Sequence, residues 1–127
     1  MSYQLLVCGS RTFSNYSVMN KELLEFLDLF GEPAVIIHGG AHGADSLASR
    51  FAYEQKINLH IEGAQWGEYG SSAGPMRNAR MASMLMPGDH IFAFVDKPIR
   101  HSRGTKHMVR LAITAGFDPR IVEAAAQ

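Results

Sequence analysis

Cysteine is almost absent from this sequence. The single cysteine, Cys8, lies inside an apolar run. One cysteine excludes an internal disulfide, and the apolar surroundings indicate a small core residue rather than a nucleophile. A chain without disulfides fits a reducing compartment, so we expect a cytoplasmic protein.

An excess of charge of either sign is also missing. Twelve Lys and Arg residues balance twelve Asp and Glu residues, which gives a formal net charge of zero. Proteins that hold the phosphate backbone of duplex DNA carry a basic footprint instead. Nucleic acid is therefore disfavoured as a partner.

Long hydrophobic runs are missing as well. No segment approaches the roughly 18 apolar residues of a membrane span, and the start of the chain, Met1 to Val7, lacks the basic region that opens a signal peptide. We expect no membrane association. The composition that remains, 46% hydrophobic and 19% charged over 127 residues, is typical of one globular domain. We predict a single domain spanning residues 1–127.

Apolar runs and helical patterns alternate along the chain. The predicted strands are Tyr3 to Cys8, Ala34 to Ile37, Asn58 to Glu62, His90 to Val95 and Pro119 to Val122. The predicted helices are Met19 to Phe30, Ala44 to Lys56, Met76 to Met86 and Thr105 to Ala115, with long connections at Gly63 to Gly74 and Asp96 to Gly104. This alternation is typical of parallel βαβ units. The predicted fold class is therefore α/β, a three-layer domain with a five-stranded parallel sheet between helices.

Glycines follow the predicted strands. In an open parallel sheet, the carboxyl ends of the strands and the amino ends of the next helices face one crevice, where ligands bind. The segment Gly39 to Asp45 follows the second strand, and bare backbone amides with a helix dipole attract a phosphate there. The same glycines also serve a plain tight turn, and the sequence leaves both interpretations open.

A second segment of this kind precedes the last helix. Ser102 to Thr105 combines a hydroxyl, a guanidinium and a bare backbone, which suits a doubly charged phosphate. The segment is not a Walker A loop, because the Gly-Lys-Ser/Thr ending is missing. We therefore do not predict triphosphate hydrolysis.

Four motifs in order resemble a known family. They are Val7-Cys8-Gly9-Ser10-Arg11, His38 to Asp45, Ala73-Gly74-Pro75-Met76-Arg77-Asn78 and Ser102 to Met108. Together they resemble the YspA-type branch of the SLOG superfamily, whose relatives include the Lonely-guy phosphoribohydrolases and the DNA-processing protein DprA. The resemblance implies a Rossmann-like fold with strand order 3-2-1-4-5. It also implies a nucleotide or nucleotide-derived ligand across the loops after strands one, two and four.

The catalytic motif of the Lonely-guy enzymes is incomplete here. That motif, Pro-Gly-Gly-x-Gly-Thr-x-x-Glu, is matched by Gly104 and Thr105, but its glutamate position falls on Met108. A thioether cannot stabilise an oxocarbenium-like centre or activate water. The nearest substitute carboxylates are Asp45, Glu68 and Asp96.

The resemblance and the missing glutamate favour a binding role. We expect a sensor or binding module for ADP-ribose, an NAD fragment or a nucleoside monophosphate. The alternative is a phosphoribohydrolase-like enzyme, because Arg77 is a counterpart of the family's arginine. A DprA-like DNA-processing protein is the weaker alternative, since the net charge is zero.

The predicted ligand-binding residues lie beyond the strand ends. They are Gly9, Ser10, Arg11, Gly39, Gly40, Gly43, Asp45, Trp66, Arg77, Asn78, Ser102, Arg103, Gly104 and Thr105. Arg11 and Arg103 serve a phosphate or are plain surface residues, whereas Gly74-Pro75 places Arg77 beside the crevice. Asp45 binds a ribose or caps the second helix.

The remaining residues leave two alternatives open and exclude one class of site. Trp66, with Tyr69, stacks on a base as part of a lid or packs under its own loop. The methionines of Met76 to Met86 indicate core packing or the face of a homodimer. The six histidines lack zinc-ligand spacing, so we predict no metal and no cofactor.

Overall fold

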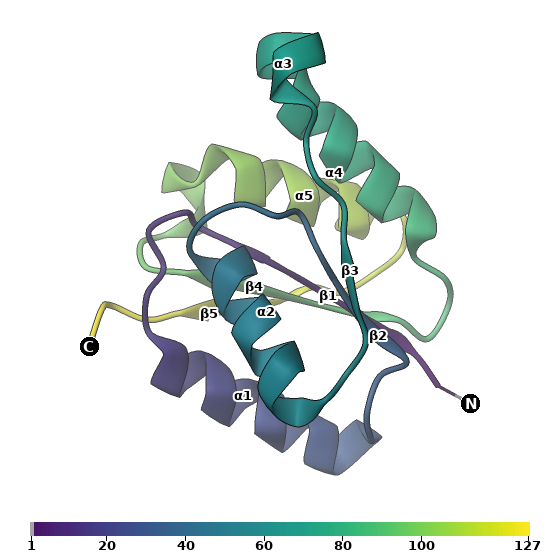
Figure 1. Ribbon diagram of the computed structural model, residues 1–127, viewed down its shortest axis with the longest axis vertical. Coiled ribbons are helices and arrows are strands. Elements are labelled where there is room, and N and C mark those ends of the chain that lie inside the picture. The colour runs from purple at the N-terminus through teal and green to yellow at the C-terminus, as the bar shows by residue number, and fades with distance from the viewer. Residues whose placement is uncertain (1) are drawn as a thin grey trace.

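The computed structural model describes residues 2–127 (Figure 1). Met1, with which the predicted domain and N-terminal segment begin, lies outside the described residues. The strands are β1 (Gln4–Gly9), β2 (Val35–His38), β3 (Leu59–Ile61), β4 (His90–Val95) and β5 (Arg120–Glu123). The helices are α1 (Tyr16–Phe30), α2 (Ala44–Gln55), α3 (Trp66–Tyr69), α4 (Ala73–Met84) and α5 (Arg103–Thr114), with 3-10 turns η1 (Gly70–Ser72) and η2 (Ile99–His101).

The five strands form one sheet in the order β3-β2-β1-β4-β5, and every pair is parallel. β1 lies in the centre, where Leu5 pairs with Ile36 on one side and with His90 on the other. A strand covered on both faces needs apolar residues at consecutive positions, which explains the nearly unbroken apolar run of β1. The α/β class and the strand order are confirmed.

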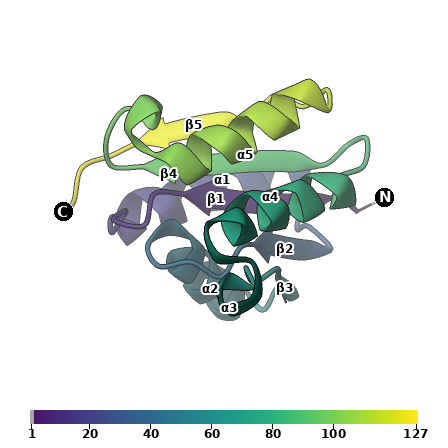
Figure 2. The same cartoon turned by 90° about the horizontal axis from the view of Figure 1, so that it is seen from above.

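Helices cover both faces of the sheet, so the domain has three layers (Figure 2). α1 and α2 enclose a core with one set of strand residues, and α4 and α5 enclose a second core with the alternate set. The first core includes Leu5, Val7, Ile36, Phe92, Phe94, Met19, Leu23 and Phe51. The second includes Leu6, Cys8, Ile37, Ile91, Met81, Met108 and Ala112. No helix within residues 2–127 has the length and apolar character needed to cross a membrane.

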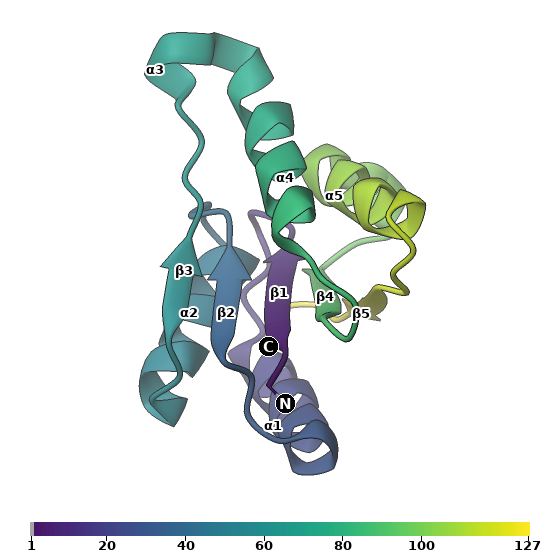
Figure 3. The ribbon, with the colours of Figure 1, turned by 90° about the vertical axis from the view of Figure 1, so that its right-hand side faces the viewer.

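The segment predicted as a long loop is partly helical. Between β3 and α4 the chain forms α3 and η1, and α4 begins at Ala73 rather than near Pro75. Proline is tolerated in a first helical turn, where its missing N–H has no helical partner to lose, so Pro75 does not mark the helix start. This segment rises beyond the carboxyl ends of the strands and forms an arm that stands over them (Figure 3).

Candidate functional site

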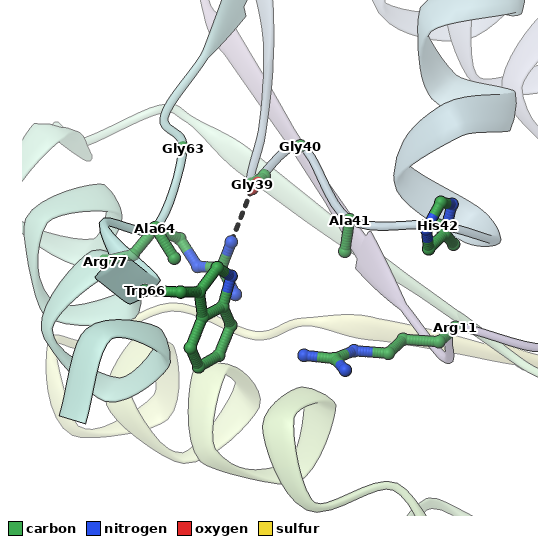
Figure 4. A pocket seen from close by; sticks show the side chains of 9 residues that line it. All are labelled: Arg11, Gly39, Gly40, Ala41, His42, Gly63, Ala64, Trp66 and Arg77. Carbon is green, nitrogen blue, oxygen red and sulfur yellow. Dashed lines mark hydrogen bonds between the residues drawn. The ribbon is translucent and has the colours of Figure 1, made fainter. Parts of the chain in front are cut away.

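An open pocket of about 550 Å³ lies where β1, β2 and β3 end beneath the arm (Figure 4). It is lined by Arg11, Gly39, Gly40, Ala41, His42, Gly63, Ala64, Trp66 and Arg77. These residues come from the connections after three neighbouring strands, from the start of α3 and from the second turn of α4. The pocket therefore lies beyond the carboxyl ends of the strands, as ligand sites of open parallel sheets do, but on the β2 and β3 side of β1 rather than between β1 and β4, where the strand order reverses.

Arg11 and Trp66 meet across the pocket. The Arg11 guanidinium carbon lies 5.6 Å from the centre of the indole ring, within the range of a cation–π contact. The outer edge of the indole packs on Gly74, where an added Cβ would come 3.0 Å from Cη2, yet the side chain remains 48% exposed. Trp66 thus combines the two alternatives of the sequence analysis: it packs within the arm and still offers ring surface to the pocket.

Arg77 is held against the Gly39 loop. Its Nη1 donates to the Gly39 carbonyl at 2.5 Å, and its Nε donates to the Asn78 side-chain oxygen at 2.8 Å. Burial lowers the pKa of Arg77, but a guanidinium remains a cation under all ordinary conditions. Neither Arg11 nor Arg77 forms a salt bridge with any residue between 2 and 127. Two guanidinium groups without a carboxylate partner therefore line the same pocket.

The amides of the glycine-rich loop are already occupied. The N–H groups of Gly39 and Ala41 donate to the Asp45 carboxylate at 3.2 and 3.1 Å, and the N–H of Gly40 donates to Nδ1 of His38 at 2.9 Å. From the sequence, these amides either bind a phosphate or belong to a plain tight turn. In this conformation three of them donate to side chains of the protein, so they are not free to bind a phosphate.

Asp45 does not cap its own helix. Gly43 is the N-cap residue of α2 and makes no side-chain cap, while the Asp45 carboxylate folds back onto the preceding loop. Burial raises the pKa of Asp45 to about 6, against the opposing influence of its two backbone hydrogen bonds and of Arg77. Asp45 therefore fixes the shape of the pocket wall and does not itself line the pocket.

His38 is a buried neutral residue beneath this loop. Its Nδ1 accepts from Gly40, so the ring proton is on Nε2, which donates to Ser49 Oγ at 2.6 Å. Burial and the charge of Arg77 lower the pKa of His38 to about 4. With its proton on Nε2, the imidazole cannot act as a base toward Ser49, and the pair does not form a nucleophilic site.

Two predicted ligand glycines serve packing. A Cβ on Gly9 would lie 2.0 Å from the Phe94 carbonyl oxygen, and a Cβ on Gly43 would lie 2.3 Å from the Ser10 carbonyl oxygen. Ser10 is buried, and its hydroxyl donates to Asp96 at 3.1 Å. These contacts bring three connections together at the carboxyl edge of the sheet.

The Ser102 to Thr105 segment does not line this pocket. The Ser102 hydroxyl donates to the Thr105 hydroxyl at 2.7 Å, and Arg103 is exposed. Asn78 is also outside the lining, although it donates to the Gly104 carbonyl and so connects α4 with this segment. The structure therefore separates the two predicted phosphate segments, and only the first contributes to the pocket.

Neither Met108, at the position of the family's glutamate, nor two of the three substitute carboxylates lies buried beside the pocket. Met108 is 1% exposed and packs in the second core, so its position does not face a ligand. The pKa of Asp96 is lowered, mainly by a hydrogen bond from Thr12. Glu68 is exposed on the arm. Among the three candidate substitutes, Asp45 is the one that is buried beside the pocket.

Four lining residues were not among the predicted ligand-binding residues: Ala41 and His42, which lie within the Gly39 to Asp45 segment, and Gly63 and Ala64. Gly63 and Ala64 follow β3, and the rule that ligands gather beyond strand ends applies to this strand as well. The resemblance directed attention to the loop after the fourth strand instead. Among residues 2–127 the structure contains no group of three or more potential metal ligands placed to hold an ion.

Comparisons with known protein sequences identify the family of this chain. The model of the YAcAr family, described as the YspA, cpYpsA-related SLOG family, matches residues 3–69, which contain every pocket residue except Arg77. The Gene 61 protein of Mycobacterium phage D29 is 31% identical over 119 residues, covering 90% of this chain and 91% of that protein. No solved structure matches the chain significantly. The chain belongs to the YspA, cpYpsA-related SLOG family.

Proposed function

We propose that the protein binds a nucleotide or a nucleotide-derived ligand, such as ADP-ribose, an NAD fragment or a nucleoside monophosphate, in the pocket beneath the arm. Membership of the SLOG family supports a nucleotide-related binding or processing role in general terms. The observation that carries the proposal is the pair of guanidinium groups, Arg11 and Arg77, that line one pocket without carboxylate partners in the described chain.

The chemistry of the lining suits the two halves of a nucleotide. Guanidinium groups bind phosphate oxygens through paired, charge-assisted hydrogen bonds. The half-exposed indole of Trp66 provides a flat surface on which a base stacks. The pocket volume lies within the usual range for small-molecule sites. Because the Gly39 to Ala41 amides are occupied, the arginines are the principal phosphate ligands in this proposal.

Titration calorimetry with AMP and ADP-ribose tests the proposal. We expect saturable binding, and a loss of about 10- to 100-fold in affinity for Arg11→Ala and for Arg77→Ala, the range for one hydrogen bond to a charged group. Arg100→Ala is the matched control, because Arg100 is an exposed arginine on η2 outside the pocket. Equal losses in all three variants would show only the effect of net charge and would contradict the assignment.

A hydrolase is the second candidate, and Asp45 is the observation that favours it. The pKa of this buried carboxyl group, about 6, lies in the range of a general acid, although in this conformation the carboxylate binds the Gly39 and Ala41 amides and does not line the pocket. Incubation with AMP or ADP-ribose, followed by chromatography that resolves free base and ribose phosphate, separates the candidates. We expect no release above an Arg77→Ala sample; steady turnover that is lost in Asp45→Asn with binding retained would establish the hydrolase.

A further inference from the structure

Asn78 uses every polar atom of its side chain. The residue is 4% exposed on α4, and its Oδ1 accepts from Arg77 Nε at 2.8 Å. Its Nδ2 donates to the Gly104 carbonyl at 3.2 Å and to Nδ1 of His107 at 3.1 Å. Both protons of the amide nitrogen thus have acceptors on α5.

The orientation of this amide follows from its partners. A guanidinium only donates hydrogen bonds and a carbonyl only accepts them, so Arg77 requires Oδ1 on its side and Gly104 requires Nδ2 on the other. A 180° flip of the amide would place Nδ2 against the Arg77 Nε donor and Oδ1 against the Gly104 carbonyl acceptor, and both hydrogen bonds would be lost. His107 must therefore present a lone pair on Nδ1 and carry its proton on Nε2.

Through Arg77, the hydrogen bonds of Asn78 extend to the pocket. Arg77 is fixed by Asn78 at Nε and by the Gly39 carbonyl at Nη1, which leaves Nη2 and one Nη1 proton for other partners. Arg77 also lines the pocket between these contacts. Its guanidinium is thus oriented before any ligand arrives.

We propose that Asn78 is a positioning residue, which holds the Arg77 guanidinium toward the pocket by bonding it to Gly104 and His107 of α5. The inference rests on the proposed function, since it concerns the same pocket. A pre-oriented cation loses less conformational freedom on binding an anion than a free arginine side chain does, so the network raises the affinity for a phosphate group. It also gives the Ser102 to Thr105 segment a role, because Gly104 supports the pocket from outside it.

Nitrogen-15 NMR tests the network without a ligand. We expect His107 to show the Nε2–H tautomer, and the Arg77 Nε–H to give a resonance protected from exchange with water that becomes exchangeable in Asn78→Ala. Ser83→Ala is the control on the same helix, because its exposed hydroxyl bonds only the Arg80 carbonyl. A His107 proton on Nδ1, or an unprotected Arg77 Nε–H in the wild type, would overturn the proposal.

Calorimetry with ADP-ribose measures the consequence for the pocket. We expect Asn78→Ala to lose about tenfold in affinity and His107→Leu, which removes one of three contacts, to lose about threefold. In Asn78→Asp, the carboxylate accepts from Arg77 but has no proton for Gly104, and its charge compensates the guanidinium, so affinity falls as well. Circular dichroism of each variant establishes that it is folded, and His107→Leu remains informative if the Asn78 variants are not.

The outcomes separate the inference from the proposed function. If Arg77→Ala weakens binding and folded Asn78→Ala does not, Asn78 has no positioning role while the proposed function stands. If the wild type binds neither AMP nor ADP-ribose, the proposed function fails, and the NMR measurements still decide whether Asn78 orients Arg77.

Discussion

The guanidinium of Arg77 lies directly against the backbone of Gly39. A Cβ at Gly39 would come 2.5 Å from Nη1 and 2.8 Å from Cζ of that side chain. The two residues are 38 positions apart in the chain, and the Gly39 carbonyl accepts from the same guanidinium. Gly39 is therefore a glycine because an arginine occupies the space of its side chain.

Gly39→Ala should weaken nucleotide binding while the fold persists. The added methyl group displaces the end of a flexible side chain rather than backbone, so we expect little change in stability and a displaced Arg77. Gly67→Ala is the matched control, because Gly67 lies on α3 outside the pocket lining and its Cβ would meet nothing within 4 Å. Gly40 is a poorer choice, since its φ of +73° makes any substitution strain the turn. Calorimetry with AMP measures the effect, and equal affinity in the two alanine variants would contradict it.

Intrinsic fluorescence should report on base binding. Trp66 is the single tryptophan of the chain, and its indole lines the pocket. Stacking of an adenine base should quench this emission along a saturable curve, whereas ribose 5-phosphate, which has no base, should bind without comparable quenching. Trp66→Leu should reduce the affinity for AMP on the order of tenfold, as expected for one lost stacking contact. Identical responses to both ligands would rule out stacking on Trp66.

Asp45 and His38 should give opposing contributions to the pH dependence of stability. Burial raises the Asp45 pKa from 3.8 to about 6, so the folded state binds more protons there and stability falls as pH rises between these values. Burial and Arg77 lower the His38 pKa from 6.5 to about 4, so the unfolded state binds more protons and stability rises with pH across that window. In the wild type the two slopes largely cancel between pH 4 and 6.

Asp45→Asn should reveal the His38 contribution. The amide oxygen still accepts from the Gly39 and Ala41 N–H groups, but the carboxyl titration is gone. We expect the free energy of unfolding of the variant to rise with pH between 4 and 6.5, more steeply than in the wild type. Urea denaturation at several pH values measures both profiles. Equal slopes would mean that Asp45 titrates normally in the folded protein.

Restoring the missing glutamate should destabilise the protein rather than activate it. Met108 is 1% exposed in the second core, so Met108→Glu buries a carboxyl group without a partner. We expect a loss of more than about 3 kcal/mol in the free energy of unfolding, and no release of base from AMP. Met108→Leu is the control, with an expected cost below about 1.5 kcal/mol. A stable Met108→Glu protein that hydrolyses AMP would show that this position faces the ligand after all.

The elements of the fold were largely predictable from local pattern. The predicted run His90 to Val95 coincides with β4, whose continuous apolar residues are required where helices cover both faces of a sheet. The run Asn58 to Glu62 contains β3, an exposed edge strand in which apolar Leu59 and Ile61 alternate with polar residues. The start of α4 was predicted too late, since proline permits a helix to begin before it. The segment Gly63 to Gly74, predicted as a long loop, contains α3 and η1 in the structure. Both elements are too short to show a helical period in the sequence.

The α/β class, the family motifs and the position of glycines after the strands were all predictable from the sequence. Those features depend on local periodicity and on residue type, which are visible within a few neighbouring positions. The sequence also marked Arg11, Gly39, Gly40, Trp66 and Arg77 as site residues, and all five line one pocket.

The contacts that each of these residues makes were not predictable from the sequence. Asp45 turns back onto Gly39 and Ala41, Arg77 reaches across to Gly39, and Asn78 reaches Gly104, 26 positions further along the chain. Such contacts depend on how α2, α4 and α5 sit on the sheet. Packing of side chains from distant segments fixes that arrangement, and no local pattern encodes it.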